Sequence, residues 1–120
     1  MKSHLFKGAL LVGACLLSAC APVSPPLYYW GNYQPSLYQY HQSGTTDYAG
    51  QIGALEAVMQ RAQAQGQSVP PGLHAHLGML YFNTGREGEG REQFAMEKQL
   101  FPESAHFVDY VMKAQPEVTP

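Results

Sequence analysis

The stretch "PPGLHAHLGMLYFNTGREGEGREQFAMEKQLFPES", residues 70 to 104, decides the fold of this chain. Gly85 divides it into two segments with helical patterns, and Pro102 closes it. Glycine commonly follows the end of a helix, and proline cannot continue one. The stretch therefore predicts two helices, over residues 71–84 and 87–100, whose short link favours antiparallel packing. Pro70 or Pro71 is expected to begin the first helix, where a missing backbone N–H costs little.

This stretch resembles the tetratricopeptide repeat, a helical hairpin of about 34 residues. With Pro71 as the first position, the matching residues are Leu77, Gly78, Tyr81, Gly85, Phe94 and Pro102. The resemblance implies that Gly78 lets the second helix approach closely. It also implies that Tyr81 and Phe94 fill the gap between the two helices and that Pro102 stops the hairpin.

Three positions depart from the repeat pattern. His74 stands where the repeat prefers tryptophan, Gly90 where it prefers alanine, and Glu97 where a small residue is usual. A single repeat cannot bury its hydrophobic faces alone. Further helices must therefore cover both sides of the hairpin.

The sequence supplies two such helices. Thr46 or Asp47 can cap a helix that runs to about Gln65, with Gly66 just beyond its end. Its apolar stripe consists of Tyr48, Ile52, Leu55, Val58, Met59 and Ala62. A last helix is predicted over residues 104–113. The expected fold is all-α: a tetratricopeptide-like antiparallel hairpin in a helical domain over residues 46–115, flanked by two further helices, with an aromatic N-terminal arm and a tail over residues 116–120.

The N-terminus is typical of an exported lipoprotein. Lys2 and Lys7 precede the apolar run "GALLVGACLLSA", which is too short to span a membrane. The end of this run and the next residue form "LSAC", residues 17 to 20, which resembles the bacterial lipobox. This resemblance implies a signal peptide over residues 1–19 and acylation of Cys20, palmitate included. Ala21 is not the aspartate that commonly retains lipoproteins at the inner membrane. We therefore expect the protein on the periplasmic side of the outer membrane.

Cysteine usage and charge exclude several function classes. Cys15 would leave with the signal and Cys20 would carry lipid, so no thiol remains for a disulfide, a zinc site or a nucleophile. The mature chain would keep five Lys and Arg against nine Asp and Glu, a formal net charge of −4. Such a charge disfavours nucleic-acid binding. No cofactor is predicted, and His74 and His76 lie too far around a helix to share a metal ion.

Between the anchor and linker of residues 20–26 and the helical domain lies an aromatic arm and loop, residues 27–45. "LYYWGNYQPSLYQY", residues 27 to 40, holds six aromatic side chains. Trp30, Tyr33, Leu37 and Tyr38 could fold back along the helices as part of the core. The arm could instead bind a neighbouring protein, or sit at the membrane interface as an aromatic collar. Its spacing also fits a short helix, despite Pro35.

Tetratricopeptide repeats bind peptides on the face made by the first helix of each hairpin. The corresponding positions here are Gly72, Ala75, Met79 and Phe82, which would form a mostly apolar groove. Asn83 lies beside them without the lysines of a carboxylate clamp. The candidate partner-binding residues are therefore Trp30, Tyr33, Tyr38, Met79 and Phe82.

Taken together, the lipobox, "YYWGNYQPSLY", "VPPGLHAHLG" and "EKQLFPESAHF" resemble a family of small bacterial outer-membrane lipoproteins of unknown function. The resemblance implies a gene neighbourhood containing a lipoprotein similar to the curli secretion channel. Such a neighbour, or another envelope lipoprotein, would be the partner. We expect a non-enzymatic assembly or accessory subunit. The alternative is a regulator of a cell-wall enzyme that binds peptidoglycan or another glycan, which binding to purified sacculi would reveal.

Overall fold

The computed structural model describes residues 1–4, 7, 24–42 and 47–114. Cys20, Thr46, the tail over residues 116–120 and most of the predicted signal peptide lie outside the described residues. The described part is all-α, as predicted, and holds no strand; its one β-bridge joins Tyr28 to Ser68. The helices are α2 (Tyr33–His41), α3 (Tyr48–Ala64), α4 (Leu73–Asn83), α5 (Glu87–Leu100), the 3₁₀ turn η1 (Pro102–Ser104) and α6 (Ala105–Ala114).

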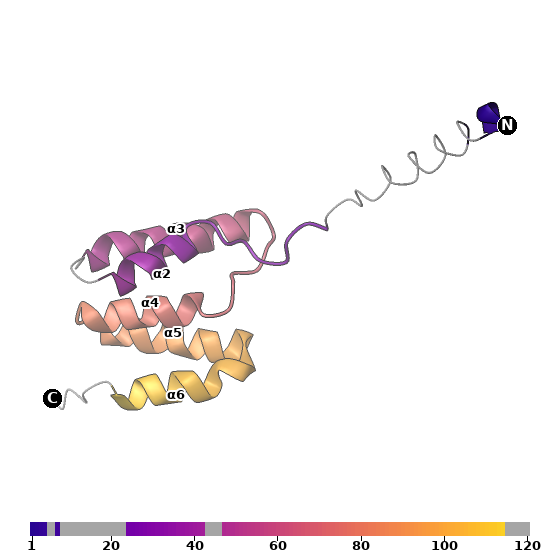
Figure 1. The fold of residues 1–120 in the computed structure, drawn as a ribbon. Coiled ribbons are helices and arrows are strands. Elements are labelled where there is room, and N and C mark those ends of the chain that lie inside the picture. The colour runs from indigo at the N-terminus through magenta and orange to yellow at the C-terminus, as the bar shows by residue number, and fades with distance from the viewer. Residues whose placement is uncertain (5–6, 8–23, 43–46, 115–120) are drawn as a thin grey trace.

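These helices form a stack in which α2 and α3 lie on one side of the α4–α5 hairpin and α6 on the other (Figure 1). Helix α3 packs on α4, and α6 packs on α5. Besides the two flanking helices that the sequence predicts, the stack contains α2, in the part of the aromatic arm whose spacing also fits a short helix. Whether the hairpin is a tetratricopeptide repeat stays a prediction.

Helix α3 begins and ends where the sequence predicts. The Asp47 carboxylate accepts a hydrogen bond from the Gly50 N–H at 2.9 Å, which satisfies a donor that the first turn leaves free. Gly66, just past the end, has a φ of 64° that favours glycine. The predicted stripe faces the core: Ile52, Leu55, Val58 and Ala62 are buried, with Tyr48 and Met59 half-buried.

Helix α4 starts two residues later than expected, and its cap comes from a distant residue. Pro70 and Pro71 precede the helix, and Gly72 holds the N-cap position with a φ of 89°. The fully buried Glu97 carboxylate accepts from the N–H groups of Gly72 at 2.7 Å and Ala75 at 3.3 Å. Glu97 departs from the repeat pattern because it caps α4. Its carboxylate accepts from N–H groups that have no partner within the helix, and the positive end of the helix dipole favours a negative charge there.

Two glycines set the close approach of α4 and α5. A Cβ at Gly78 would lie 2.9 Å from the Phe94 ring and 3.0 Å from the Gly90 carbonyl oxygen. A Cβ at Gly90 would lie 2.6 Å from the Phe82 ring. The role predicted for Gly78 is thus what the structure shows. Phe94, fully buried, stacks on Phe82 with ring centroids 5.5 Å apart.

Other repeat positions behave differently from their expected roles. Leu77 is fully buried, but Tyr81 belongs to the core cluster shared with α3. Its hydroxyl donates to Glu56 of α3 at 2.6 Å, so Tyr81 does not fill the gap between α4 and α5 as predicted. Burial, followed by this hydrogen bond, raises the pKa of Tyr81 to about 12. Pro102 is exposed and begins η1 directly after the hairpin.

Part of the aromatic arm is helical. Helix α2 tolerates Pro35 because this residue lies in the first turn, where no intrahelical donor is needed. Tyr33 is 7% exposed and joins the core, with its hydroxyl 2.7 Å from where a Gly72 Cβ would stand. Burial, followed by the nearby Glu97 carboxylate, raises the pKa of Tyr33. Helix α2 therefore packs on α3, and its Tyr33 side chain reaches the start of α4.

Candidate functional site

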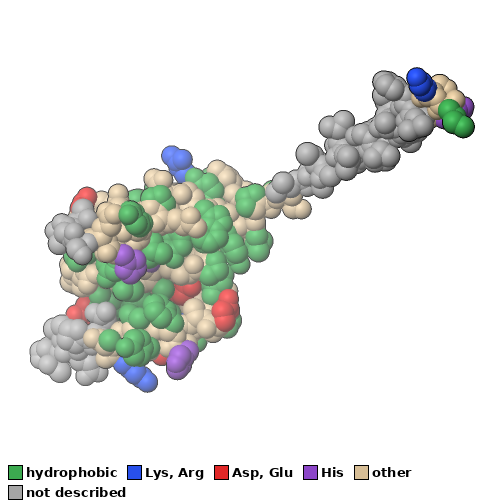
Figure 2. Space-filling view, in the orientation of Figure 1, with side chains coloured by type: hydrophobic (Ala, Val, Ile, Leu, Met, Phe, Trp, Pro, Cys, Tyr) green, Lys and Arg blue, Asp and Glu red, His purple; other side chains and the backbone are tan. Residues whose placement is uncertain are grey.

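An open apolar groove of about 390 Å³ lies between α2 and α6, over α4. Its volume falls within the range of about 300–1,000 Å³ that is usual for binding sites. Its lining consists of Tyr33, Leu37, Tyr40 and His41 from the α2 side, Gly72, Ala75, His76 and Met79 from the α4 side, and Phe107 and Val111 from α6. Figure 2 shows hydrophobic side chains gathered on this face, between the upper and lower layers of the stack.

The α2 wall is fixed by aromatic contacts with the floor. The Tyr40 ring meets His76 edge-on, with centroids 4.9 Å apart, and also contacts Tyr48 of α3. The Tyr40 hydroxyl accepts a weak hydrogen bond from the Asn83 side-chain amide at 3.4 Å. These contacts hold α2 over α4, so the wall is part of the fold.

His76 is the polar feature of the groove floor. It is 4% exposed, and among the described residues its Nε2 has no hydrogen-bond partner. Burial, followed by the nearby His41, lowers the pKa of His76 to about 4. The imidazole is therefore neutral at pH 7. Its Nε2 is itself buried, so this atom stays unsatisfied within the described part of the fold, which is costly in an apolar environment.

The α6 wall leaves large apolar side chains open to solvent. Phe107 is 51% exposed at the groove, whereas its neighbour Val108 is fully buried against the hairpin. Val111 is half-buried. Among the residues that the structure describes, no Lys, Arg, Asp or Glu lines the groove. Such a surface suits contact with an uncharged, apolar segment better than with a charged ligand.

The structure distributes the five predicted partner-binding residues over several environments. Met79 lies in the groove, as expected. Phe82 does not line the groove, because its ring packs on Phe94 and over Gly90 in the hairpin. Tyr33 lines the groove but is almost wholly buried.

The two remaining predicted residues lie away from the groove. Trp30 stacks on Tyr33 with centroids 6.2 Å apart and stays 41% exposed. Tyr38 is 66% exposed and points away from the core, so the expected folding back of the arm is wrong for this residue.

Sequence reasoning missed half of the groove. Tyr40, His41, Phe107 and Val111 were outside the predicted set, because the repeat pattern describes only one face of α4. His76 lies on α4 but is not one of the groove positions of the repeat. The walls come from segments on either side of the repeat. The helical spacing of Leu37, Tyr40 and His41 was the available signal for the α2 wall.

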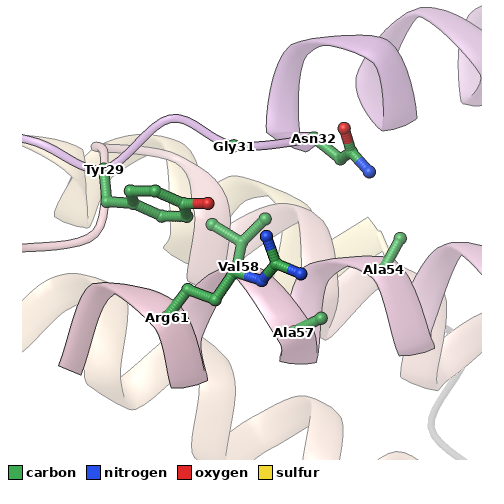
Figure 3. Close-up of a pocket in the computed structure, with 7 residues that line it drawn as sticks. All are labelled: Tyr29, Gly31, Asn32, Ala54, Ala57, Val58 and Arg61. Atoms are coloured by element: carbon green, nitrogen blue, oxygen red, sulfur yellow. The ribbon is translucent and has the colours of Figure 1, made fainter. Parts of the chain in front are cut away.

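A smaller hollow of about 130 Å³ lies between the segment before α2 and the outer side of α3 (Figure 3). Tyr29, Gly31 and Asn32 face Ala54, Ala57, Val58 and Arg61 across it. Its volume is below that of usual ligand sites. Within the described residues, no three His, Cys, Asp or Glu side chains group as metal ligands, and no helix has the length and apolarity needed to cross a membrane.

A family model described as a domain of unknown function (DUF4810) matches residues 27–111. The chain belongs to this family. No curated protein and no solved structure matches the chain. The DUF4810 match begins before α2 and ends at Val111, so it includes both walls of the groove.

Proposed function

We propose that the protein is a non-catalytic lipoprotein, anchored through Cys20 to the periplasmic face of the outer membrane, that binds another envelope protein in the groove between α2, α4 and α6. The observation that carries the proposal is the open apolar groove with exposed Phe107 on one wall. Exposed apolar surface that is contiguous with a preformed hollow is characteristic of protein interaction sites. The resemblance of the hairpin to a tetratricopeptide repeat also supports binding at α4, because such repeats bind peptides on the face of their first helix.

The chemistry of the groove indicates what the partner contributes. Leu37, Met79 and Val111 offer apolar contact, and methionine adapts to irregular shapes. His76 lies beneath the lining with its Nε2 buried, so it offers this atom to a ligand only if neighbouring side chains move. We infer a partner segment with apolar or aromatic side chains. Such a segment gains affinity from the burial of those side chains.

The anchor proposal is supported by the sequence. "LSAC" ends an apolar run that two lysines precede, which is the pattern of lipoprotein signals. Several acyl chains on one residue give stable membrane attachment, because each buried methylene contributes about 0.8 kcal/mol. Another envelope lipoprotein, or one similar to a secretion channel, would share this membrane surface.

Site-specific crosslinking tests the groove. A photoreactive amino acid is placed at Phe107, and in a matched variant at Tyr110 on the same helix, which is 70% exposed and does not line the groove. We expect the Phe107 probe to form one discrete adduct with an envelope protein and the Tyr110 probe to form none. Adding Met79→Glu should abolish the adduct. Equal adducts at both positions, or none at Phe107, would contradict the groove proposal.

The anchor is tested separately with Cys20→Ser. The unchanged protein should incorporate an alkyne-labelled palmitate and fractionate with the outer membrane, whereas the variant should do neither. A variant that still fractionates with the outer membrane would show that the anchor is elsewhere.

A further inference from the structure

A second apolar surface covers the end of the domain at which the N-terminal segment enters. Leu27, Tyr28, Ser68, Val69, Leu100 and Phe101 surround a hollow of about 300 Å³ there. Leu27 is 70% exposed and Leu100 48% exposed. We call these six residues, together with Trp30, the entry-end patch. Trp30 joins them because its ring packs edge-on against Tyr28, with centroids 6.3 Å apart.

Hydrogen bonds hold the entry-end patch together. The Tyr29 N–H donates to the Ser68 carbonyl at 2.9 Å, and the Gln67 side-chain amide donates to the Pro26 carbonyl at 2.9 Å. The Tyr28 ring meets Phe101 edge-on, with centroids 6.1 Å apart. The segment before α2 is thus fixed against the loop after α3 and the end of α5. The exposed leucines therefore project from an ordered part of the fold.

The position of the entry-end patch relative to the proposed anchor limits what it can contact. Six residues lie between Cys20 and Leu27, and the seven residue-to-residue steps of this segment reach at most about 25 Å when fully extended. Figure 1 shows the segment before α2, the loop between α3 and α4 and the end of α5 at the same end of the stack. A chain attached to lipid at Cys20 therefore keeps this end close to the bilayer surface.

The composition of the entry-end patch suits a lipid interface. None of its seven residues is charged. Tryptophan and tyrosine concentrate where the headgroups of a bilayer meet its acyl chains, because their rings are apolar at one end and polar at the other. The weak affinity of a few apolar side chains suffices when a tether holds them at high local concentration.

We infer that the entry-end patch rests on the membrane, with Leu27 and Leu100 at the boundary of the acyl chains and Trp30 at headgroup level. This inference depends on the proposed Cys20 anchor and is independent of partner binding in the groove. It fixes the orientation of the domain. The lining of the groove shares no residue with the entry-end patch, so the groove remains accessible to a neighbouring protein.

The test uses the full lipidated protein in vesicles of phosphatidylethanolamine and phosphatidylglycerol. Trp30 is the only tryptophan, so its emission reports on this end alone. We expect acyl chains brominated near the headgroups to reduce Trp30 emission, and aqueous iodide to have little effect. In the double variant Leu27→Gln/Leu100→Gln, iodide should quench Trp30 emission and brominated acyl chains should no longer do so. The control is the double variant Tyr38→Gln/Tyr110→Gln, which alters exposed aromatic residues elsewhere. Its quenching by iodide and by brominated lipid should equal that of the unchanged protein.

Flotation of the same vesicles separates the two proposals. If the protein does not float with the vesicles, the anchor is wrong and the inference is wrong with it. If it floats but iodide quenches Trp30 and brominated lipid does not, the anchor stands and the membrane contact is overturned. Protection of Trp30 from both quenchers would also overturn the inference, because a protein surface would then cover the patch.

Discussion

The two sides of helix α4 differ in how completely they are packed. The side toward α3 and α5 is closely packed. Leu73, Leu77 and Leu80 are fully buried there, and Gly78 packs against the backbone of Gly90. Toward α2 and α6 it forms the floor of an open groove. The difference arises because α2 packs mainly on α3, and α6 on α5, so a gap remains between these two edge helices over α4. The closed side determines stability, and the open side is available for binding.

The largest expected effect is on the closed side. Gly78→Leu should destabilise the protein by about 1–3 kcal/mol or more, because its side chain must displace the Phe94 ring and the Gly90 carbonyl. Gly88→Leu on α5 is the matched control, since nothing lies within 4 Å of a Cβ there. Urea unfolding measures both. Similar midpoints for the two variants would show that the close approach of α4 and α5 contributes little.

The Glu97 cap should give the next largest effect. Glu97→Gln should cost about 1.5–3 kcal/mol, because it weakens two charge-assisted hydrogen bonds and directs an amide N–H₂ toward backbone donors. Glu103→Gln removes the same charge from an exposed position and should change stability by less than about 0.5 kcal/mol. Thermal unfolding monitored by circular dichroism compares them. Equal melting temperatures would contradict the capping role.

On the open side, His76 should make stability depend on pH. Its pKa in the folded state, about 4, lies below its ordinary value of 6.5, so the unfolded chain binds more protons between these values. Stability should therefore fall as pH drops from about 6.5 toward 4. The loss is on the order of 2 kcal/mol after allowance for solvent screening.

The variant His76→Gln isolates this contribution. Its stability should change less between pH 7 and 4.5 than that of the unchanged protein, while His106→Gln, at an exposed position, should retain the full dependence. Melting temperatures across this range supply the measurement. Parallel curves for the unchanged protein and His76→Gln would disprove the assignment.

The smallest effect on stability is expected at Phe107. Phe107→Ala removes a half-exposed side chain and should change the free energy of unfolding by less than about 0.5 kcal/mol. The adjacent Val108→Ala removes a fully buried one and should cost about 1–3 kcal/mol. Denaturant titrations distinguish them. A large loss for Phe107→Ala would mean that the α6 wall is part of the core.

The sequence predicted the helices well because their boundaries depend on local signals. Asp47, Gly66 and Gly85 each act within a few residues, and α5 has the predicted bounds. The start of α4 was predicted too early because its cap, Glu97, is 25 residues away. Met79 was placed in the groove correctly. The groove walls depend on how α2 and α6 pack, which a repeat pattern confined to residues 71–102 does not contain.

The most direct measurement of the central claim is the reactivity of a single thiol in the groove. Phe107→Cys and Tyr110→Cys each add one thiol to a chain whose Cys15 and Cys20 would be removed or lipidated. Labelling with a charged maleimide is compared in intact envelopes and in purified protein. The proposed function predicts that Phe107→Cys reacts much more slowly in envelopes, whereas Tyr110→Cys reacts at the same rate in both. Equal rates for Phe107→Cys in both settings would show that no partner occupies the groove.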